Sequence, residues 1–154
     1  MSALHPSDST PQRLAEVAAL SALEVQLGFP VQGESLKLGD DCSANVDGIN
    51  LEHHFICEVF SRIGKLQAAQ VEKVASDILK LNFIEGRLGG IWRKSICFID
   101  ETAANTLRNR SWLAAVARTD HIEVIVAAVP LNILETVKAA QARQFMSNPL
   151  KRDG

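Results

Sequence analysis

The sequence lacks a long apolar run, a paired-cysteine motif and an excess of positive charge. No apolar run approaches the roughly 18 residues that a membrane span requires, so we expect no contact with a membrane. Lysine and arginine together number 16, against 18 aspartates and glutamates, and the net charge is −2. There is therefore no global basic field that would attract nucleic acid, and binding to phosphates must come from a local patch.

Cysteine is also scarce, and its placement indicates a reducing compartment. Cys42, Cys57 and Cys97 include no CxxC pair, and the last two lie within apolar strand-like runs. A reduced thiol in such a run acts as a small hydrophobic group. Residues 1–10 contain neither the basic segment nor the apolar core of a secretion signal. We therefore expect the protein in the cytoplasm.

What the sequence does contain is the composition of an ordinary folded domain. Its 154 residues are 47% hydrophobic and 22% charged, and a chain of this length can bury one continuous core. The polar residues 1–10, which include Pro6, predict a flexible N-terminal arm. The sequence predicts one domain over residues 11–147 and a short C-terminal tail over residues 148–154.

The order of the apolar patterns predicts an α/β fold. Apolar residues with a helical period predict helices over residues 11–28, 66–81, 101–118 and 130–146. Apolar or alternating runs between turn residues predict strands over residues 33–39, 43–50, 55–61, 95–100 and 122–129. The glycine-rich residues 82–90 predict a loop. The alternation of strand and helix after residue 55 favours parallel strands that follow an antiparallel hairpin, in one mixed sheet flanked by helices.

Two acidic residues in the predicted hairpin suggest a metal-dependent site. Asp47 and Glu58 are eleven residues apart, which allows two strands and a tight corner to bring them together. Two carboxylates plus a strand carbonyl can hold Mg²⁺ or Mn²⁺, which activates a water molecule beside a phosphate. Gln70 and Lys73 share a polar stripe of the next predicted helix, and a lysine there can stabilise charge on the phosphate.

Each of these residues also has a structural interpretation. Asp47 precedes Gly48 and can be a turn residue. Glu58 lies inside an apolar run and needs a partner when buried, either a metal or a structural pair with Arg62 or Lys73. Gln70 and Lys73 can belong to a solvated helix face.

The element order and the Asp47–Glu58 pair together resemble the PD-(D/E)XK nuclease superfamily. The resemblance covers residues 12–146, and it implies the restriction-endonuclease-like fold. It also implies that Asp47 and Glu58 are catalytic residues that bind Mg²⁺ or Mn²⁺. Either Glu34 or Glu24 would be an upstream acidic residue of the site, whereas we expect Glu16 to be solvated.

The motif departs from the family at one important position. The lysine expected two residues after Glu58 is replaced by Phe60, which carries no charge. Some members of the superfamily carry this lysine on the following helix, and Lys73 is the candidate for that role here, with Gln70 one turn before it. Lys65 is the alternative in the connector, and Arg62 and Lys65, together with Glu34, are the candidates for contacts to the substrate.

The resemblance implies a small metal-dependent nuclease that hydrolyses DNA. We expect so small a nuclease without a targeting domain to form a homodimer or to serve a larger complex. The alternative is a catalytically inactive domain of the same fold that binds a protein or a nucleic acid, which the loss of the lysine at Phe60 favours. A third interpretation is an interaction domain of another α/β fold, in which the carboxylates form ordinary salt bridges.

Overall fold

Five strands form one open mixed sheet in the computed structural model, which describes residues 10–147. The strand order follows the sequence, β1-β2-β3-β4-β5. The strands are β1 (Gln32–Lys37), β2 (Ser43–Asn50), β3 (Phe55–Phe60), β4 (Arg93–Phe98) and β5 (Ile122–Val126). Neighbours are antiparallel from β1 to β3 and parallel from β3 to β5. The predicted α/β class, with an antiparallel hairpin followed by parallel strands, is confirmed.

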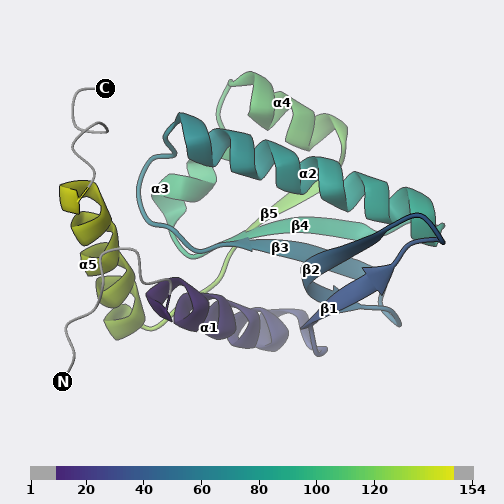
Figure 1. The fold of residues 1–154 in the computed structure, drawn as a ribbon, viewed down its shortest axis with the longest axis horizontal. Coiled ribbons are helices and arrows are strands. Elements are labelled where there is room, and N and C mark those ends of the chain that lie inside the picture. Colours follow the sequence, from purple (N-terminus) through teal and green to yellow (C-terminus); the bar gives the residue numbers. More distant parts are fainter. Residues whose placement is uncertain (1–9, 148–154) are drawn as a thin grey trace.

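Helices cover both faces of this sheet (Figure 1). They are α1 (Thr10–Leu27), α2 (Ala68–Leu88), α3 (Glu101–Ala104), a 3-10 turn η1 (Asn105–Leu107), α4 (Trp112–Thr119) and α5 (Leu131–Ser147). Helix α1 lies on one face, α2 and α4 lie on the other, and α5 stands at one end next to α1. No helix within residues 10–147 is long and apolar enough to cross a membrane.

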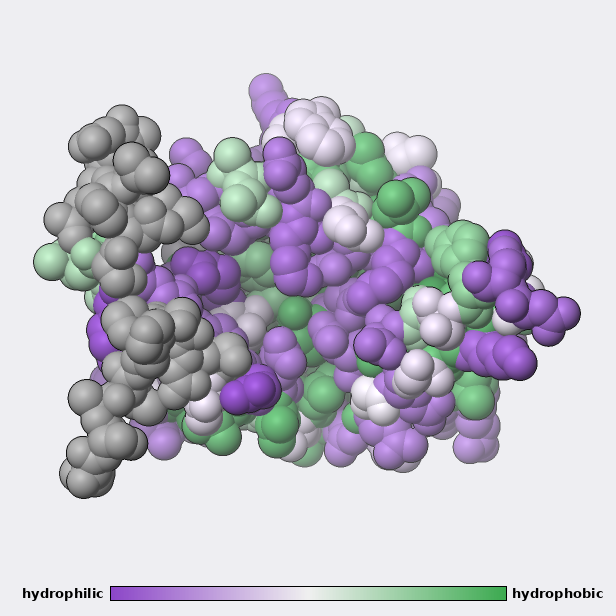
Figure 2. Space-filling view, in the orientation of Figure 1, coloured by the Kyte–Doolittle hydropathy of each residue, from purple (hydrophilic) through white to green (hydrophobic). Residues whose placement is uncertain are grey.

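The sheet separates two hydrophobic cores. Ile56, Leu81 and Ile96 belong to the core on the side of α2 and α4. Leu23 and Phe55 belong to the core on the side of α1 and α5. All six residues of β3 are buried, as its apolar run predicts. In the view that takes in α1, α2 and the β1–β2 hairpin, hydrophilic residues cover most of the surface and hydrophobic residues form smaller groups between them (Figure 2).

The prediction of a loop over residues 82–90 is wrong, because α2 continues to Leu88. A glycine within a helix costs about 1 kcal/mol relative to alanine, and Gly86 lies at an exposed position of this helix. Leu81 and Ile84 are both fully buried against the sheet, and this burial outweighs the glycine penalty. The helix ends at Gly89, whose positive φ of 77° suits a residue without a side chain.

The single helix predicted over residues 101–118 is also wrong, because polar side chains interrupt it. Ser111 N–H donates to Asn109 Oδ1, and Ser111 Oγ then accepts from Ala114 N–H to cap α4. Such local bonds compete with a continuous helix. Residues 1–9 of the predicted N-terminal arm lie outside the described residues. Its last residue, Thr10, belongs to α1. The predicted tail at 148–154 lies outside the described residues.

Candidate functional site

Asp47 lies at a bulge in β2. Gln32 of β1 is paired with Ile49 and Glu34 with Val46, so two steps along β1 match three steps along β2. The extra residue of β2 therefore falls at Asp47 and the adjoining glycine. As a result, Val46 and Ile49 both point into the core beneath α2, although they are three residues apart. A bulge of this kind re-aims the side chain that it carries.

The carboxylates of Asp47 and Glu58 each bond to a backbone N–H where β2 and β3 stop pairing. The last paired residues on this side are Gly48 and Cys57. Beyond them, Asp47 N–H donates to Glu58 Oε2 at 3.0 Å, and Val59 N–H donates to Asp47 Oδ2 at 2.8 Å. Side-chain oxygens thus satisfy backbone donors that would otherwise bond to the neighbouring strand. The structure brings the two predicted acidic residues into direct contact.

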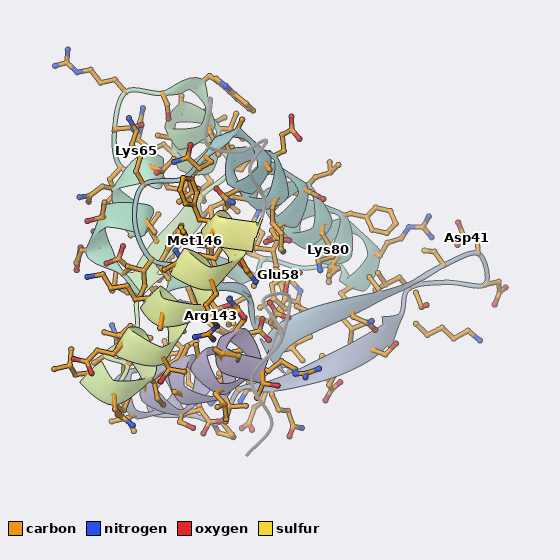
Figure 3. The ribbon with its side chains drawn as sticks, turned by 60° about the vertical axis from the view of Figure 1, so that its left-hand side comes forward. Asp41, Glu58, Lys65, Lys80, Arg143 and Met146 are labelled. Carbon is orange, nitrogen blue, oxygen red and sulfur yellow. The ribbon has the colours of Figure 1, made fainter. Side chains whose placement is uncertain are left out.

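Glu58 is buried, and it has a partner that was not predicted. Its residue exposure is 1%, and Lys80 of α2 forms an ion pair with its Oε1. Figure 3 shows Glu58 and Lys80 side by side, with Asp41 at the distant tip of the β1–β2 hairpin. Both oxygens of Glu58 therefore have a protein partner. The predicted structural partners Arg62 and Lys73 do not fill this role.

A cavity of about 460 Å³ opens beside Asp47. Its walls come from α1, the bulge of β2, the end of β3, the connector after β3, and helices α2 and α5. The lining residues are Gln12, Glu16, Asp47, Val59, Phe60, Ser61, Arg62, Ala69, Gln70, Lys73 and Gln144. Four predicted site residues, Asp47, Arg62, Gln70 and Lys73, thus share one cavity. Glu58 does not line it and lies directly behind Asp47.

Two carboxylates, Glu16 and Asp47, line the cavity, and a third, Asp77, is bonded to the lining residue Lys73. Burial, followed by the Asp47 carboxylate, raises the pKa of Glu16, against the opposing charges of Lys73 and Arg13. Burial also raises the pKa of Asp77, against the charge and hydrogen bonds of Lys73 and with a further contribution from Asp47. Lys73 Nζ contacts the two Asp77 oxygens at 3.2 and 3.1 Å. Nearby carboxylates that repel one another favour a bound cation.

Glu16 is the functional candidate that the sequence analysis missed. It was expected to be solvated, but it lines the cavity together with Asp47. The two residues predicted as the upstream acidic residue of the site, Glu34 and Glu24, do not line the cavity. Glu34 is exposed on β1, and Glu24 Oε1 accepts a hydrogen bond from Val31 N–H at 2.9 Å in the turn after α1. The helical pattern places Glu16 next to the buried Ala15 and Ala19. This pattern does not indicate whether Glu16 or Glu24 lies beside the bulge of β2.

The oxygen donors that the described residues place around the cavity do not form a complete metal cage. No three His, Cys, Asp or Glu residues within residues 10–147 form a group that could hold a metal ion. Mg²⁺ does not need such a cage, since it keeps several waters and commonly uses one or two carboxylates plus substrate phosphates. Asp47 and Glu16 offer carboxylate oxygens, and Gln12 has a buried amide whose oxygen and nitrogen have no hydrogen-bond partner in the described part of the chain.

The comparisons with known proteins identify no relative: no family model, no curated protein and no solved structure matches the chain. The resemblance of the Asp47–Glu58 motif therefore stays a prediction. The chemistry of the site has to be argued from its own geometry.

Proposed function

We propose that this protein is a small metal-dependent nuclease of the PD-(D/E)XK type that hydrolyses phosphodiester bonds in DNA. The observation that carries the proposal is the convergence of Asp47, Lys73 and Gln70 on one cavity, with Glu58 in contact with Asp47. The element order, a helix, three antiparallel strands, a helix and a parallel strand, also suits a restriction-endonuclease-like core.

The residues of the cavity have the chemistry that this reaction requires. Asp47 would hold Mg²⁺ or Mn²⁺ through its hard oxygens, with water and substrate oxygens completing the shell, and a bound ion would polarise the phosphate and lower the pKa of a water molecule. The Lys73 ammonium would neutralise charge that develops on the phosphate oxygens. The amides of Gln12 and Gln70 would orient the water or the phosphate, because each presents both a donor and an acceptor.

Glu16 is suited to accept a proton from the attacking water. Its raised pKa, which results from burial and the Asp47 carboxylate, makes it a stronger base than an exposed glutamate. Lys73 is now held by Asp77, and a phosphate entering the cavity would compete with that carboxylate. Since Lys73 is largely exposed, with 61% of its side chain accessible, this exchange requires little rearrangement.

A second candidate is a catalytically inactive domain of the same fold that binds a protein or a nucleic acid. The Glu58–Lys80 ion pair favours it, because the ammonium already occupies a carboxylate that the family motif assigns to a metal. Phe60 stands where the motif has its lysine, and it is 4% exposed and packed in the core. These features predict binding without hydrolysis.

Cleavage assays separate the two candidates. Purified protein is incubated with single-stranded and duplex DNA in Mg²⁺, Mn²⁺ or EDTA, beside Asp47→Asn and Lys73→Ala. Asp40→Asn is the matched control, because Asp40 is an exposed aspartate at the tip of the β1–β2 hairpin.

We expect Asp47→Asn and Lys73→Ala to lower the metal-dependent rate by about 100-fold or more, since each removes charge at the phosphate, and Asp40→Asn to match the wild type. Cleavage that survives in Asp47→Asn would contradict the assignment. Absence of cleavage by the wild-type protein in either metal, with DNA binding retained, would support the inactive domain instead.

A further inference from the structure

A second cavity of about 330 Å³ adjoins the candidate site. Phe60, Arg62 and Gln70 line both cavities, so the two cavities are direct neighbours. Lys65 and Phe145 line the second cavity alone. The second cavity therefore combines two cationic side chains with aromatic rings.

Arg62 lies between the two cavities as a half-buried cation. Burial lowers its pKa, because the charged guanidinium loses hydration there. Its Nη1 donates to Gln144 Oε1 at 3.3 Å, and no carboxylate within residues 10–147 forms an ion pair with it. A partly desolvated guanidinium with a neutral partner is well suited to bind a phosphate, to which it can donate two parallel hydrogen bonds.

The connector that carries Arg62 and Lys65 is held in place from two sides. Ile63 N–H donates to Gln141 Oε1 at 2.7 Å, and Gln141 Nε2 donates back to Ile63 carbonyl oxygen at 2.9 Å. Gly64 N–H donates to Asp100 Oδ2 at 2.8 Å. Because the backbone is fixed to α5 and to the start of α3, a ligand would bind here with little loss of backbone freedom.

We propose that this second cavity holds the nucleotide next to the scissile phosphate, with its phosphate on Arg62 and Lys65, and that the substrate is therefore single-stranded nucleic acid. This inference rests on the proposed nuclease function. In a single strand the faces of the bases are free to stack on aromatic side chains, and Phe145, at 50% exposure, lines the cavity beside the two cations. In a duplex the bases are paired and stacked inside the helix.

The charge of the cavities also favours a single strand. Binding to duplex DNA depends largely on the number of phosphates that lysine and arginine neutralise, and a protein with strongly salt-dependent binding makes about 6–10 such contacts. The two cavities contain three cations, Arg62, Lys65 and Lys73, and the last is paired with Asp77. This charge matches contact with a few phosphates of one flexible strand and not with both strands of a duplex.

Fluorescence anisotropy in EDTA tests the proposal without requiring cleavage. The probes are a short labelled oligothymidylate and a labelled hairpin duplex of similar length. The variants are Arg62→Gln and Lys65→Gln, with the exposed Arg110→Gln as the matched control. Arg62→Lys, which keeps the charge with little change in volume, shows whether a loss reflects charge or folding.

We expect the wild-type protein to bind the single strand at least about tenfold more tightly than the hairpin. Arg62→Gln should weaken binding of the single strand about tenfold and reduce the slope of log K against log salt by about 0.7, the value for one phosphate contact on a single strand. Lys65→Gln should reduce the slope in the same way, Arg62→Lys should retain it, and Arg110→Gln should match the wild type.

Equal affinity for the strand and the hairpin, or unchanged affinity and salt slope in Arg62→Gln, would overturn the inference. Either result combined with Asp47-dependent cleavage would leave the nuclease proposal standing. Arg62-dependent binding of the strand by a protein that does not cleave in Mn²⁺ would confirm the subsite and contradict the catalytic proposal, so the two failures are distinguishable.

Discussion

The ion pair between Lys80 and Glu58 predicts a specific loss of stability in Lys80→Met. Methionine retains most of the apolar stem of lysine, so the change removes mainly the ammonium. The carboxylate of Glu58 would then remain buried with only one of its oxygens bonded, to Asp47 N–H. A buried charge without its partner is unfavourable because it has lost hydration and gained nothing in return.

The exposure of the two side chains determines the expected magnitude. The Glu58 side chain is 2% exposed and that of Lys80 is 34% exposed. Removal of one partner from a fully buried pair costs about 3–5 kcal/mol. Because water reaches Lys80 and screens part of the interaction, we expect a smaller loss, about 2 kcal/mol at neutral pH. With an m value of about 2 kcal/mol/M, this lowers the midpoint of unfolding by about 1 M urea.

Urea unfolding, followed by circular dichroism, measures this loss, and a double-mutant cycle identifies its origin. Glu58→Gln removes the charge that needs a partner, so the double variant Glu58→Gln/Lys80→Met should lose less than the two single variants together, by about 1–2 kcal/mol. Lys138→Met is the matched control, because Lys138 is an exposed lysine on α5, and we expect it to change the midpoint little.

Two results would refute this reasoning. A midpoint for Lys80→Met that equals the wild-type value would mean that Glu58 is not stabilised by the ammonium. Additive losses in the double variant would mean that the two side chains contribute independently and that the contact carries no coupling energy.

Three further predictions concern the β2 bulge, helix α2 and the cavity beside Asp47. A methyl group on Gly48 would meet Val31 Cγ1 at 2.5 Å and Cys57 Sγ at 2.7 Å, so Gly48→Ala should destabilise the fold by about 1–3 kcal/mol. Gly86→Ala, whose methyl group meets nothing within 4 Å, should instead raise the urea midpoint by the equivalent of about 0.5–1 kcal/mol, and a loss there would contradict the continuation of α2. Because burial and the Asp47 carboxylate raise the pKa of Glu16 above its ordinary 4.5, the contribution of Glu16 to the stability of the wild-type protein should fall as the pH rises from 4.5 through the raised pKa. Glu16→Gln should therefore be more stable than the wild type at about pH 8 and equal to it at about pH 4, and thermal unfolding that shows a constant difference at both pH values would exclude this cause.

Most of the fold was predictable because it depends on local patterns. The continuous apolar run of β3 and the apolar period of α2 are properties of adjacent residues, so β3 forms where it is predicted and α2 begins within two residues of its predicted start. Two boundaries were wrong, each for a different physical reason. Gly86 signals a break, but the burial of Leu81 and Ile84 keeps α2 helical, whereas polar side chains around Ser111 break the helix that the apolar period predicts.

The candidate site was predictable only in part. The sequence marked Asp47, Gln70 and Lys73, and these residues do line one cavity. It gave no indication that Glu16 would face Asp47 or that Lys80 would pair with Glu58. Both contacts join residues from different elements, so they depend on how each helix is rotated and placed against the sheet.

The sequence by itself determined the elements, their order and the mixed sheet, because side-chain periods of two and 3.6 residues decide which face of each element is buried. Only the tertiary structure decided which polar groups meet. The extra residue of β2 is visible only in its pairing with β1, and the gap that it leaves beside β3 is where Asp47 turns toward α1 and α2. A bulge is a mismatch between two strands, and neither strand alone contains it.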